Sequence, residues 1–237
     1  MNGQLFHHVA RVYASKYDEP RPRIAYAFTM NIVFDFGNVL FEWNPARLID
    51  EHFAQPSTSP ATSVALADTL INHKDWLDFD LGLLDVGTLA RRSAARLSLD
   101  RAHLHAFIER IPHVLPTIDP TIAVFNQLAD EVADNCAHRL VYLSNLPASF
   151  APVLEARCPW IARFEGGIFS GRVNLAKPDA AIYALAEQKL NLMPNETLFL
   201  DDSPRNVDAA RARGWAAEII TSPQSTRDAL MKHGVLR

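Results

Sequence analysis

The 237-residue sequence contains little cysteine, and it lacks long runs of apolar or of basic residues. Its two cysteines, Cys136 and Cys158, are too few for a disulfide framework in a chain of this length, so we expect reduced thiols and a cytoplasmic protein. No stretch approaches the roughly 18 apolar residues that a bilayer-spanning helix needs. Twenty-three basic residues against 27 acidic ones give a net charge of −4, without the basic surface of a nucleic-acid-binding protein. We therefore expect a soluble protein with no membrane and no nucleic-acid partner.

The composition and length favour a globular fold. The apolar share is 49%, which is enough for a full core, and at about 150 residues per domain the length suggests one large domain or a domain with a lid. Residues 1–29 are interrupted by Pro20 and Pro22 and show no sustained period, so we expect a poorly structured N-terminal extension there. The apolar run that begins at Met30 and ends at Asp35 predicts the first strand of the folded domain.

The remaining chain alternates between helical and strand patterns. Residues 45–115 have a helical pattern, and after Pro116 the strands are continuously apolar and separated by helices. Strands are expected at 140–143, 197–200 and 217–220, helices at about 121–133, 148–156, 179–190 and 204–213 and at the C-terminus, and a short hairpin at 168–173 around Gly171. Gly214 is expected to end its helix in the left-handed conformation. Continuously apolar strands between helices indicate an α/β fold with an open, parallel, Rossmann-like sheet (residues 30–44 and 116–237) and a small, all-helical inserted cap (residues 45–115).

Polar residues gather where the predicted strands end. Asp35 follows the first strand, Ser144 and Asn145 follow a later one, and Asp201-Asp202 follow another, while Lys177 lies in a loop before a helix. In an open parallel sheet, ligands bind at the carboxyl ends of the strands. Carboxylates in contact repel each other unless a cation lies between them. An all-oxygen cluster of this kind suits Mg²⁺, which keeps several waters and accepts phosphate as a ligand.

The same residues fit phosphoryl transfer. Ser144, Lys177 and the backbone amides after Asp35 could hold a tetrahedral anion, and a carboxylate that faces a phosphoryl group can act as its nucleophile. No Gly-x-x-x-x-Gly-Lys-Ser/Thr pattern suggests a nucleotide site. The residues alone therefore predict metal-assisted phosphoryl transfer without a nucleotide-binding loop.

The set Asp35, Ser144, Lys177 and Asp201-Asp202, in this order, resembles the haloacid dehalogenase-like hydrolase superfamily over about residues 30–237. Each motif is weak alone, but the four together with a helical insertion after the first are specific. The segment 35–39, followed by Phe41 and Trp43, resembles the branch of small-cap enzymes that contains a bacterial glucose-1-phosphate phosphatase. The resemblance implies a phosphoric monoester hydrolase.

The resemblance also implies residue roles. Asp35 is expected to be the catalytic nucleophile that becomes phosphorylated, and Lys177 is expected to bridge it and the phosphate. Ser144, Asn145 and Asn38 are assigned to binding the substrate.

The metal site implied by the resemblance comprises Asp35, the Gly37 carbonyl, Asp202 as a direct ligand and Asp201 as its acidic neighbour. One departure from the family pattern is at Gly37, where most of its phosphatases carry a second aspartate that protonates the leaving group. A carboxylate general acid contributes about 10²–10⁴-fold. We therefore expect a substrate with a good leaving group, such as a sugar-1-phosphate.

Two alternatives remain open. A metal-independent 2-haloacid dehalogenase would use Asp35 on carbon, although the doublet Asp201-Asp202 argues against it because added negative charge there has no use without a cation. A weakly active binding or regulatory protein is the other alternative, and it is disfavoured by the retained nucleophile and lysine. The sequence assigns no role to Asp78 or Asp80 in the predicted cap, and we expect a monomer or a homodimer.

Overall fold

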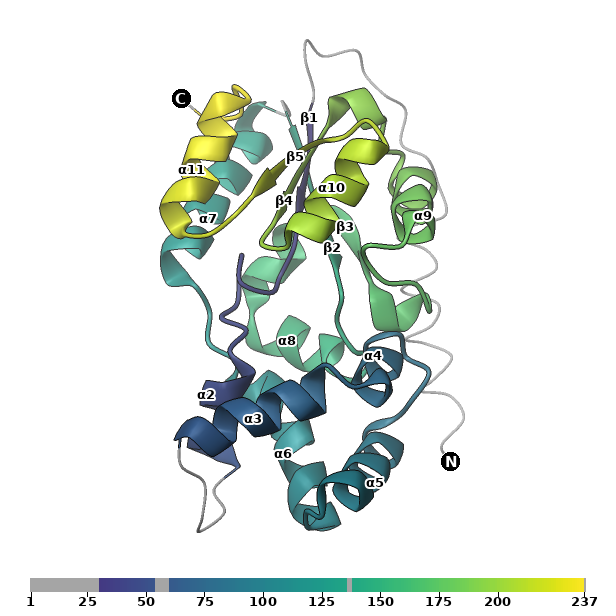
Figure 1. Cartoon of the computed structure of the whole chain (residues 1–237). Helices are drawn as coiled ribbons and strands as arrows, with labels where there is room; N and C mark the ends of the chain where they lie inside the picture. The colour runs from purple at the N-terminus through teal and green to yellow at the C-terminus, as the bar shows by residue number, and fades with distance from the viewer. Residues whose placement is uncertain (1–29, 54–59, 136–137, 237) are drawn as a thin grey trace, which may run out of the picture.

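The computed structural model describes residues 30–53, 60–135 and 138–236, so the extension expected over residues 1–29 lies outside the described residues. In this part of the chain five strands form one sheet, in the order β3-β2-β1-β4-β5 (Figure 1). The strands are β1 (Met30–Phe34), β2 (His138–Ser144), β3 (Gly166–Phe169), β4 (Thr197–Asp201) and β5 (Ala216–Ile219). Every neighbouring pair is parallel, which confirms the predicted α/β fold class.

Helices cover both faces of the sheet (Figure 1). They are α7 (Asp119–Asn135), α8 (Ala151–Arg157), α9 (Ala180–Leu190), α10 (Pro204–Ala212) and α11 (Pro223–Lys232). Successive side chains of a strand point to opposite faces, so the central strand β1 contributes to two separate cores. Ile32 and Phe34 pack in one core with α7, α8 and α11, and Val33 packs in the other with α9 and α10. Burial on both faces explains why this strand is continuously apolar.

In the described residues between β1 and α7, five helices lie at the carboxyl end of the sheet (Figure 1). They are α2 (Pro45–His52), α3 (Pro60–Ile71), α4 (Lys74–Asp80), α5 (Val86–Leu97) and α6 (Arg101–Val114). Four begin at a side chain that accepts a hydrogen bond from a free backbone N–H of the first turn, as N-caps do: Asn44, His73, Asp85 and Asp100. These helices occupy the part of the chain that the sequence predicts to be the cap.

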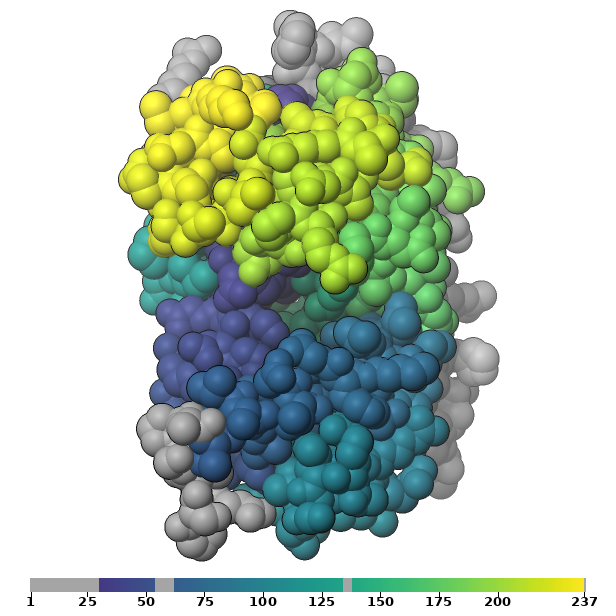
Figure 2. Space-filling view, viewed as in Figure 1, coloured from purple at the N-terminus to yellow at the C-terminus, as the bar shows by residue number. Residues whose placement is uncertain are grey.

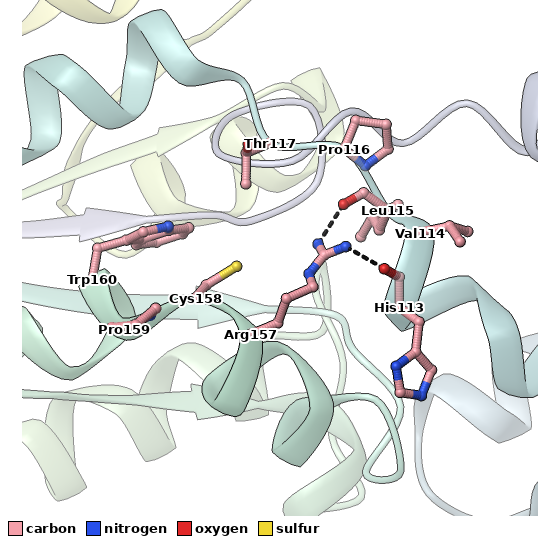
Figure 3. A pocket seen from close by; sticks show the side chains of 9 residues that line it. All are labelled: His113, Val114, Leu115, Pro116, Thr117, Arg157, Cys158, Pro159 and Trp160. Carbon is pink, nitrogen blue, oxygen red and sulfur yellow. Dashed lines mark hydrogen bonds between the residues drawn. The ribbon is translucent and has the colours of Figure 1, made fainter.

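Arg157 at the end of α8 ties the last of these helices to the core. Its guanidinium donates to the carbonyl of His113 at 2.8 Å and to the carbonyl of Leu115, which are at the C-terminal end of α6 (Figure 3). The last carbonyls of a helix lack partners within the helix, and a cation there also complements the helix dipole. Arg157, Cys158 and Trp160 line a pocket at this junction of cap and core (Figure 3). The pocket shares no residue with the acidic strand ends.

The prediction of a hairpin around Gly171 is wrong. Residues 166–169 pair in parallel with β2, and a short 3₁₀ turn (Ser170–Arg172) follows instead of a return strand. A Cβ on Gly171 would lie 2.3 Å from the backbone nitrogen of Ala148, so this glycine permits close packing of two loops rather than a tight turn. Gly214 does have the predicted left-handed conformation, with φ of +87°.

Two smaller expectations concern cysteine and membranes. Cys158 is a buried free thiol, and Cys136 lies outside the described residues. Within the ranges that the structure describes, no helix has both the length and the apolar character needed to cross a bilayer.

Candidate active site

Three carboxylates meet at the carboxyl ends of β1 and β4. Asp35 directly follows β1, Asp201 ends β4, and Asp202 comes next. The two strands are parallel neighbours, and the ladder continues through a hydrogen bond from the Asp35 N–H to the Leu200 carbonyl at 2.9 Å. One carboxylate oxygen from each of the three residues lies within 4.8 Å of the others. Asp35 and Asp201 are buried and Asp202 is half-buried, so the cluster is largely removed from water.

Lys177 enters this cluster from the loop between β3 and α9. Its buried Nζ lies 2.8 Å from Asp35 Oδ1 and 2.6 Å from Asp201 Oδ2. The side chain of Asn145, one residue beyond β2, accepts a hydrogen bond from the Lys177 N–H at 2.8 Å and donates to the Lys177 carbonyl at 2.9 Å. The ammonium therefore bridges two of the carboxylates, and Asn145 fixes the backbone that carries it.

Asp201 and Asp202 are both held by further hydrogen bonds. Asp201 Oδ1 accepts from the Ser203 N–H at 2.8 Å and from Asn206 Nδ2 at 3.0 Å. Asp202 Oδ2 accepts from Asn38 Nδ2 at 2.8 Å. Sequence reasoning missed Asn206, although its place in the first turn of α10, just after the acidic doublet, is a usable signal. These contacts fix the directions in which the two carboxylates point.

Asn38 and Asn145, which the sequence assigns to substrate binding, form hydrogen bonds with other groups of the protein. Asn38 accepts a hydrogen bond from the Trp43 N–H at 3.0 Å while it donates to Asp202, and both polar atoms of the Asn145 side chain bond to the backbone of Lys177. Their expected roles as substrate ligands therefore stay predictions. Ser144 ends β2, is 2% exposed and lies beside Asp35, where its hydroxyl lowers the pKa of that carboxyl; its expected role in holding phosphate stays a prediction.

Burial dominates the electrostatics of the cluster. It raises the pKa of Asp35 to about 7; the Lys177 ammonium opposes this shift, and the negative charge of Asp201 adds to it. Burial also raises the pKa of Asp202. Although burial alone would lower the pKa of Lys177, the carboxylates of Asp35 and Asp201 outweigh it and raise that pKa. Lys177 is thus held as a cation between two acids.

The cluster fits a hard divalent cation. Three carboxylates face one ammonium, which leaves an excess of negative charge in a region of low dielectric. Asp35 Oδ1 is buried and is paired with Lys177 by charge, yet no hydrogen bond with good geometry reaches it from the described residues. Oxygen donors in this number suit Mg²⁺, which binds through one or two carboxylates and keeps waters for a phosphate to replace.

Gly37 provides space but no functional group. A Cβ built on it would have its nearest neighbours at 3.9 Å, Asp35 Oδ2 and Trp43 Cβ, and its φ is not in the left-handed region. A larger side chain would therefore fit here and would point toward the cluster. The role of its carbonyl as a metal ligand remains a prediction.

A row of aromatic rings leads from the cluster into the cap. Trp43 lies 6.2 Å from Trp76 of α4, Trp76 lies 5.7 Å from Phe79, and Phe79 lies 5.5 Å from Phe150 of the core, measured between ring centroids. A hollow between the core and the cap is visible in Figure 2. Trp76, Phe79 and Phe150 are buried, so among these four rings only Trp43 presents apolar surface near the cluster.

Comparison with known families gives a match over most of the chain. A family model described as haloacid dehalogenase-like hydrolase matches residues 29–214. A relative described as a sesquiterpene phosphatase of Aspergillus oryzae is 26% identical over 197 residues, which cover 82% of this chain and 91% of that protein.

Solved structures share the fold. An HAD family enzyme of Bacteroides thetaiotaomicron, in complex with magnesium and inorganic phosphate, has a TM-score of 0.61 at 18% identity and covers 81% of this chain and 93% of its own. The L-2-haloacid dehalogenase of Xanthobacter autotrophicus has a TM-score of 0.61 at 19% identity, with 89% and 85% covered. At these identities the likeness shows the fold alone, so the chemistry has to be argued from the site.

Proposed function

The chain belongs to the haloacid dehalogenase-like hydrolase family, and from this premise we propose that it is a Mg²⁺-dependent phosphatase of small phosphorylated metabolites. The observation that carries the proposal is the cluster itself: a buried carboxylate at Asp35 beside the Lys177 ammonium, with two further acids within 4.8 Å. The phosphatase named among the relatives supports the same reaction.

The residues of the site have different roles in the proposed reaction. Asp35 attacks phosphorus, the bond to the leaving alcohol breaks, and the aspartyl-phosphate that forms is then hydrolysed. Lys177 and Ser144 offset the negative charge of the phosphoryl oxygens. Asp35, Asp201, Asp202 and the Gly37 carbonyl are the residues that would hold Mg²⁺, which when bound supplies positive charge opposite the phosphoryl group.

The dehalogenase alternative fits this site less well. A carboxylate that attacks carbon gains nothing from a neighbouring acidic pair, yet Asp201 and Asp202 are both retained, and hydrogen bonds from Asn206 and Asn38 orient them. Halide release from a 2-haloacid that persists in EDTA would support that alternative over the phosphatase.

We propose sugar-1-phosphates as the first substrate class. Gly37 carries no acid, and an anomeric hydroxyl leaves more readily than an ordinary alcohol. A clear preference for glucose-6-phosphate over glucose-1-phosphate would contradict this choice.

A monophosphate of an apolar alcohol is the second class. Trp43, which is partly exposed and lies beside Gly37, offers such an alcohol an apolar surface near the cluster, and the Aspergillus oryzae relative is described as a sesquiterpene phosphatase. Farnesyl phosphate is a suitable probe for this class.

A phosphate-release screen tests the proposal. The purified chain is offered glucose-1-phosphate, glucose-6-phosphate and farnesyl phosphate, each with Mg²⁺ and with EDTA. We expect release in Mg²⁺ and loss of release in Asp35→Asn, which would also exclude a protein that only binds its ligand. Release by Asp35→Asn at the rate of the parent would overturn the proposal.

A further inference from the structure

No acid of the cluster is free to protonate a departing alcohol. Gly37 has no side chain, Asp201 is bonded to Lys177, and Asp202 accepts from Asn38. Asp35 is the proposed nucleophile. For an ester whose alcohol needs a proton to depart, a side-chain donor would therefore come from outside the strand ends, and the cap helices form the opposite side of the hollow (Figure 2).

The C-terminal end of α4 is fixed against the loops at the carboxyl ends of β2 and β3 (Figure 1). Ser170 Oγ donates a hydrogen bond to the Asp80 carbonyl at 2.6 Å, and Ser170 Oγ itself accepts from the Leu146 N–H at 2.9 Å. Gly82 is packed so closely that a Cβ on it would lie 2.2 Å from the Gly171 carbonyl oxygen. This end of the cap is thus connected through Ser170 to Leu146, which is two positions along the chain from Ser144.

Asp80 lies one turn after Trp76, on the face of α4 that packs against the segment following β1. Residues four apart on a helix are neighbours on one face, so Asp80 shares its face with Trp76. The ring of Trp76 packs on Trp43, and Trp43 Cβ is 3.9 Å from the position of a Cβ on Gly37. The backbone of Asp80 is thus held on the β2 and β3 side of the site through Ser170, and its helix face is packed on the β1 side through Trp76.

Asp80 differs from the other aspartates of residues 74–85. Their carboxylates are paired with Arg92 (Asp75), with Lys74 (Asp78) and with the N–H of Thr88 (Asp85). No ion pair or hydrogen bond reaches the Asp80 carboxyl from the residues that the structure describes, and burial raises its pKa to about 7. A group that holds a proton near neutral pH and has no structural partner has the properties of a general acid.

We propose that Asp80 is the catalytic acid and base that replaces the carboxylate missing at Gly37; this role rests on the phosphatase function proposed above. As Asp35 attacks phosphorus, the P–O bond to the alcohol breaks, its electron pair stays on the alcohol oxygen, and Asp80 gives that oxygen its proton. In the second half, water attacks phosphorus, Asp80 takes a proton from the water, and the bond to Asp35 breaks. Phosphate leaves, and Asp35 and Asp80 return to their starting states.

The test compares two phosphate esters of similar shape whose leaving groups depend on protonation to different extents. Phenyl phosphate has a poor leaving group, and 4-nitrophenyl phosphate has a good one. The kcat/KM for each is measured with saturating Mg²⁺ on the full chain, on Asp80→Asn and on Asp78→Asn. Asp78 is on the same helix and is paired with the exposed Lys74, so its variant controls for changes to α4. Because kcat/KM reports the steps through departure of the alcohol, it isolates the proton donation.

We expect Asp80→Asn to lower kcat/KM by about 10²-fold or more for phenyl phosphate, and by at least about 10-fold less for 4-nitrophenyl phosphate. Activity retained on the nitrophenyl ester also shows that the variant is folded. Equal losses on the two esters, or the same pattern in Asp78→Asn, would overturn the role of Asp80 and leave the phosphatase function intact. Absence of phosphate release from both esters by the parent would overturn both.

Discussion

Asn145 holds the backbone of Lys177 from both sides, accepting from its N–H at 2.8 Å and donating to its carbonyl at 2.9 Å. The two residues are 32 positions apart, yet this pair connects the end of β2 to the loop that delivers the ammonium. A side chain as long as that of lysine reaches Asp35 and Asp201 together only when its backbone is fixed. We infer that Asn145 positions Lys177.

Replacing Asn145 by Ala removes both hydrogen bonds. Each such bond contributes about 0.5–1.5 kcal/mol, so we expect a modest loss of stability and a larger loss of phosphate release, about 10-fold or more, because the ammonium moves. Asn195→Ala, at an exposed turn residue before β4, is the control. Thermal melting and kcat measure the two effects. Unchanged kcat in Asn145→Ala would show that the loop holds Lys177 without it.

Replacing Lys177 by Met leaves two buried carboxylates without their cation. Breaking a buried ion pair on one side costs about 3–5 kcal/mol, and we expect a loss of this order in the free energy of unfolding at pH 8 in EDTA. The loss should be smaller at pH 5.5, where Asp35 can take up a proton. Urea denaturation of Lys177→Met and of Lys189→Met, at an exposed lysine of α9, provides the comparison. Equal losses in the two variants would contradict the expectation.

The raised pKa of Asp35 makes the metal-free protein less stable as the pH rises. Its pKa is about 7 in the folded state and 3.8 as an ordinary aspartate, so between these values the folded state binds more protons than the unfolded state. The stability that this proton uptake provides is present below about pH 4 and is lost as the pH rises through 7. Asp35→Asn lacks this dependence, so at pH 8 in EDTA we expect it to be more stable than the parent by on the order of a few kcal/mol, since each pKa unit corresponds to about 1.4 kcal/mol.

The check is urea denaturation of both proteins from pH 4.5 to pH 8. Asp80 also has a pKa raised to about 7 and contributes a slope of the same sign, but it is present in both proteins and cancels in the difference. If the free energies of unfolding of the parent and of Asp35→Asn change with pH in parallel, ionisation of Asp35 does not destabilise the folded state.

Metal binding can be measured without turnover. A ligand at 100 times its dissociation constant stabilises a folded protein by about 2.7 kcal/mol, so Mg²⁺ should raise the melting temperature of the parent by several degrees. Asp202→Asn should need at least about 10-fold more Mg²⁺ for the same rise, since it loses a charged ligand. Asp208→Asn, on the exposed side of α10, should behave as the parent. A rise that is the same in all three proteins would place the ion elsewhere.

Features that depend on strand ends could be predicted from the sequence, whereas features that depend on close packing could not. Apolar strands between helices allowed the parallel sheet and the convergence of Asp35 and Asp201 to be inferred, because neighbouring parallel strands end at one edge. The hairpin predicted around Gly171 was wrong because a glycine that admits a neighbouring backbone looks the same in sequence as a glycine that turns the chain. Asp80 was not assigned because its role depends on how α4 docks, which no local pattern encodes.

Placing an aspartate at position 37 should compensate for the loss of Asp80. The nearest atoms to a Cβ there are 3.9 Å away, so the side chain fits and directs a carboxylate toward the substrate. In the Asp80→Asn background, we expect Gly37→Asp to restore about 10-fold or more of the lost kcat/KM on phenyl phosphate, because a second acid can then protonate the alcohol. Gly37→Asn in the same background is the matched control, since it has the same shape and no acidic proton. If the asparagine restores activity as well as the aspartate does, the defect of Asp80→Asn lies in substrate placement, and proton transfer does not explain it.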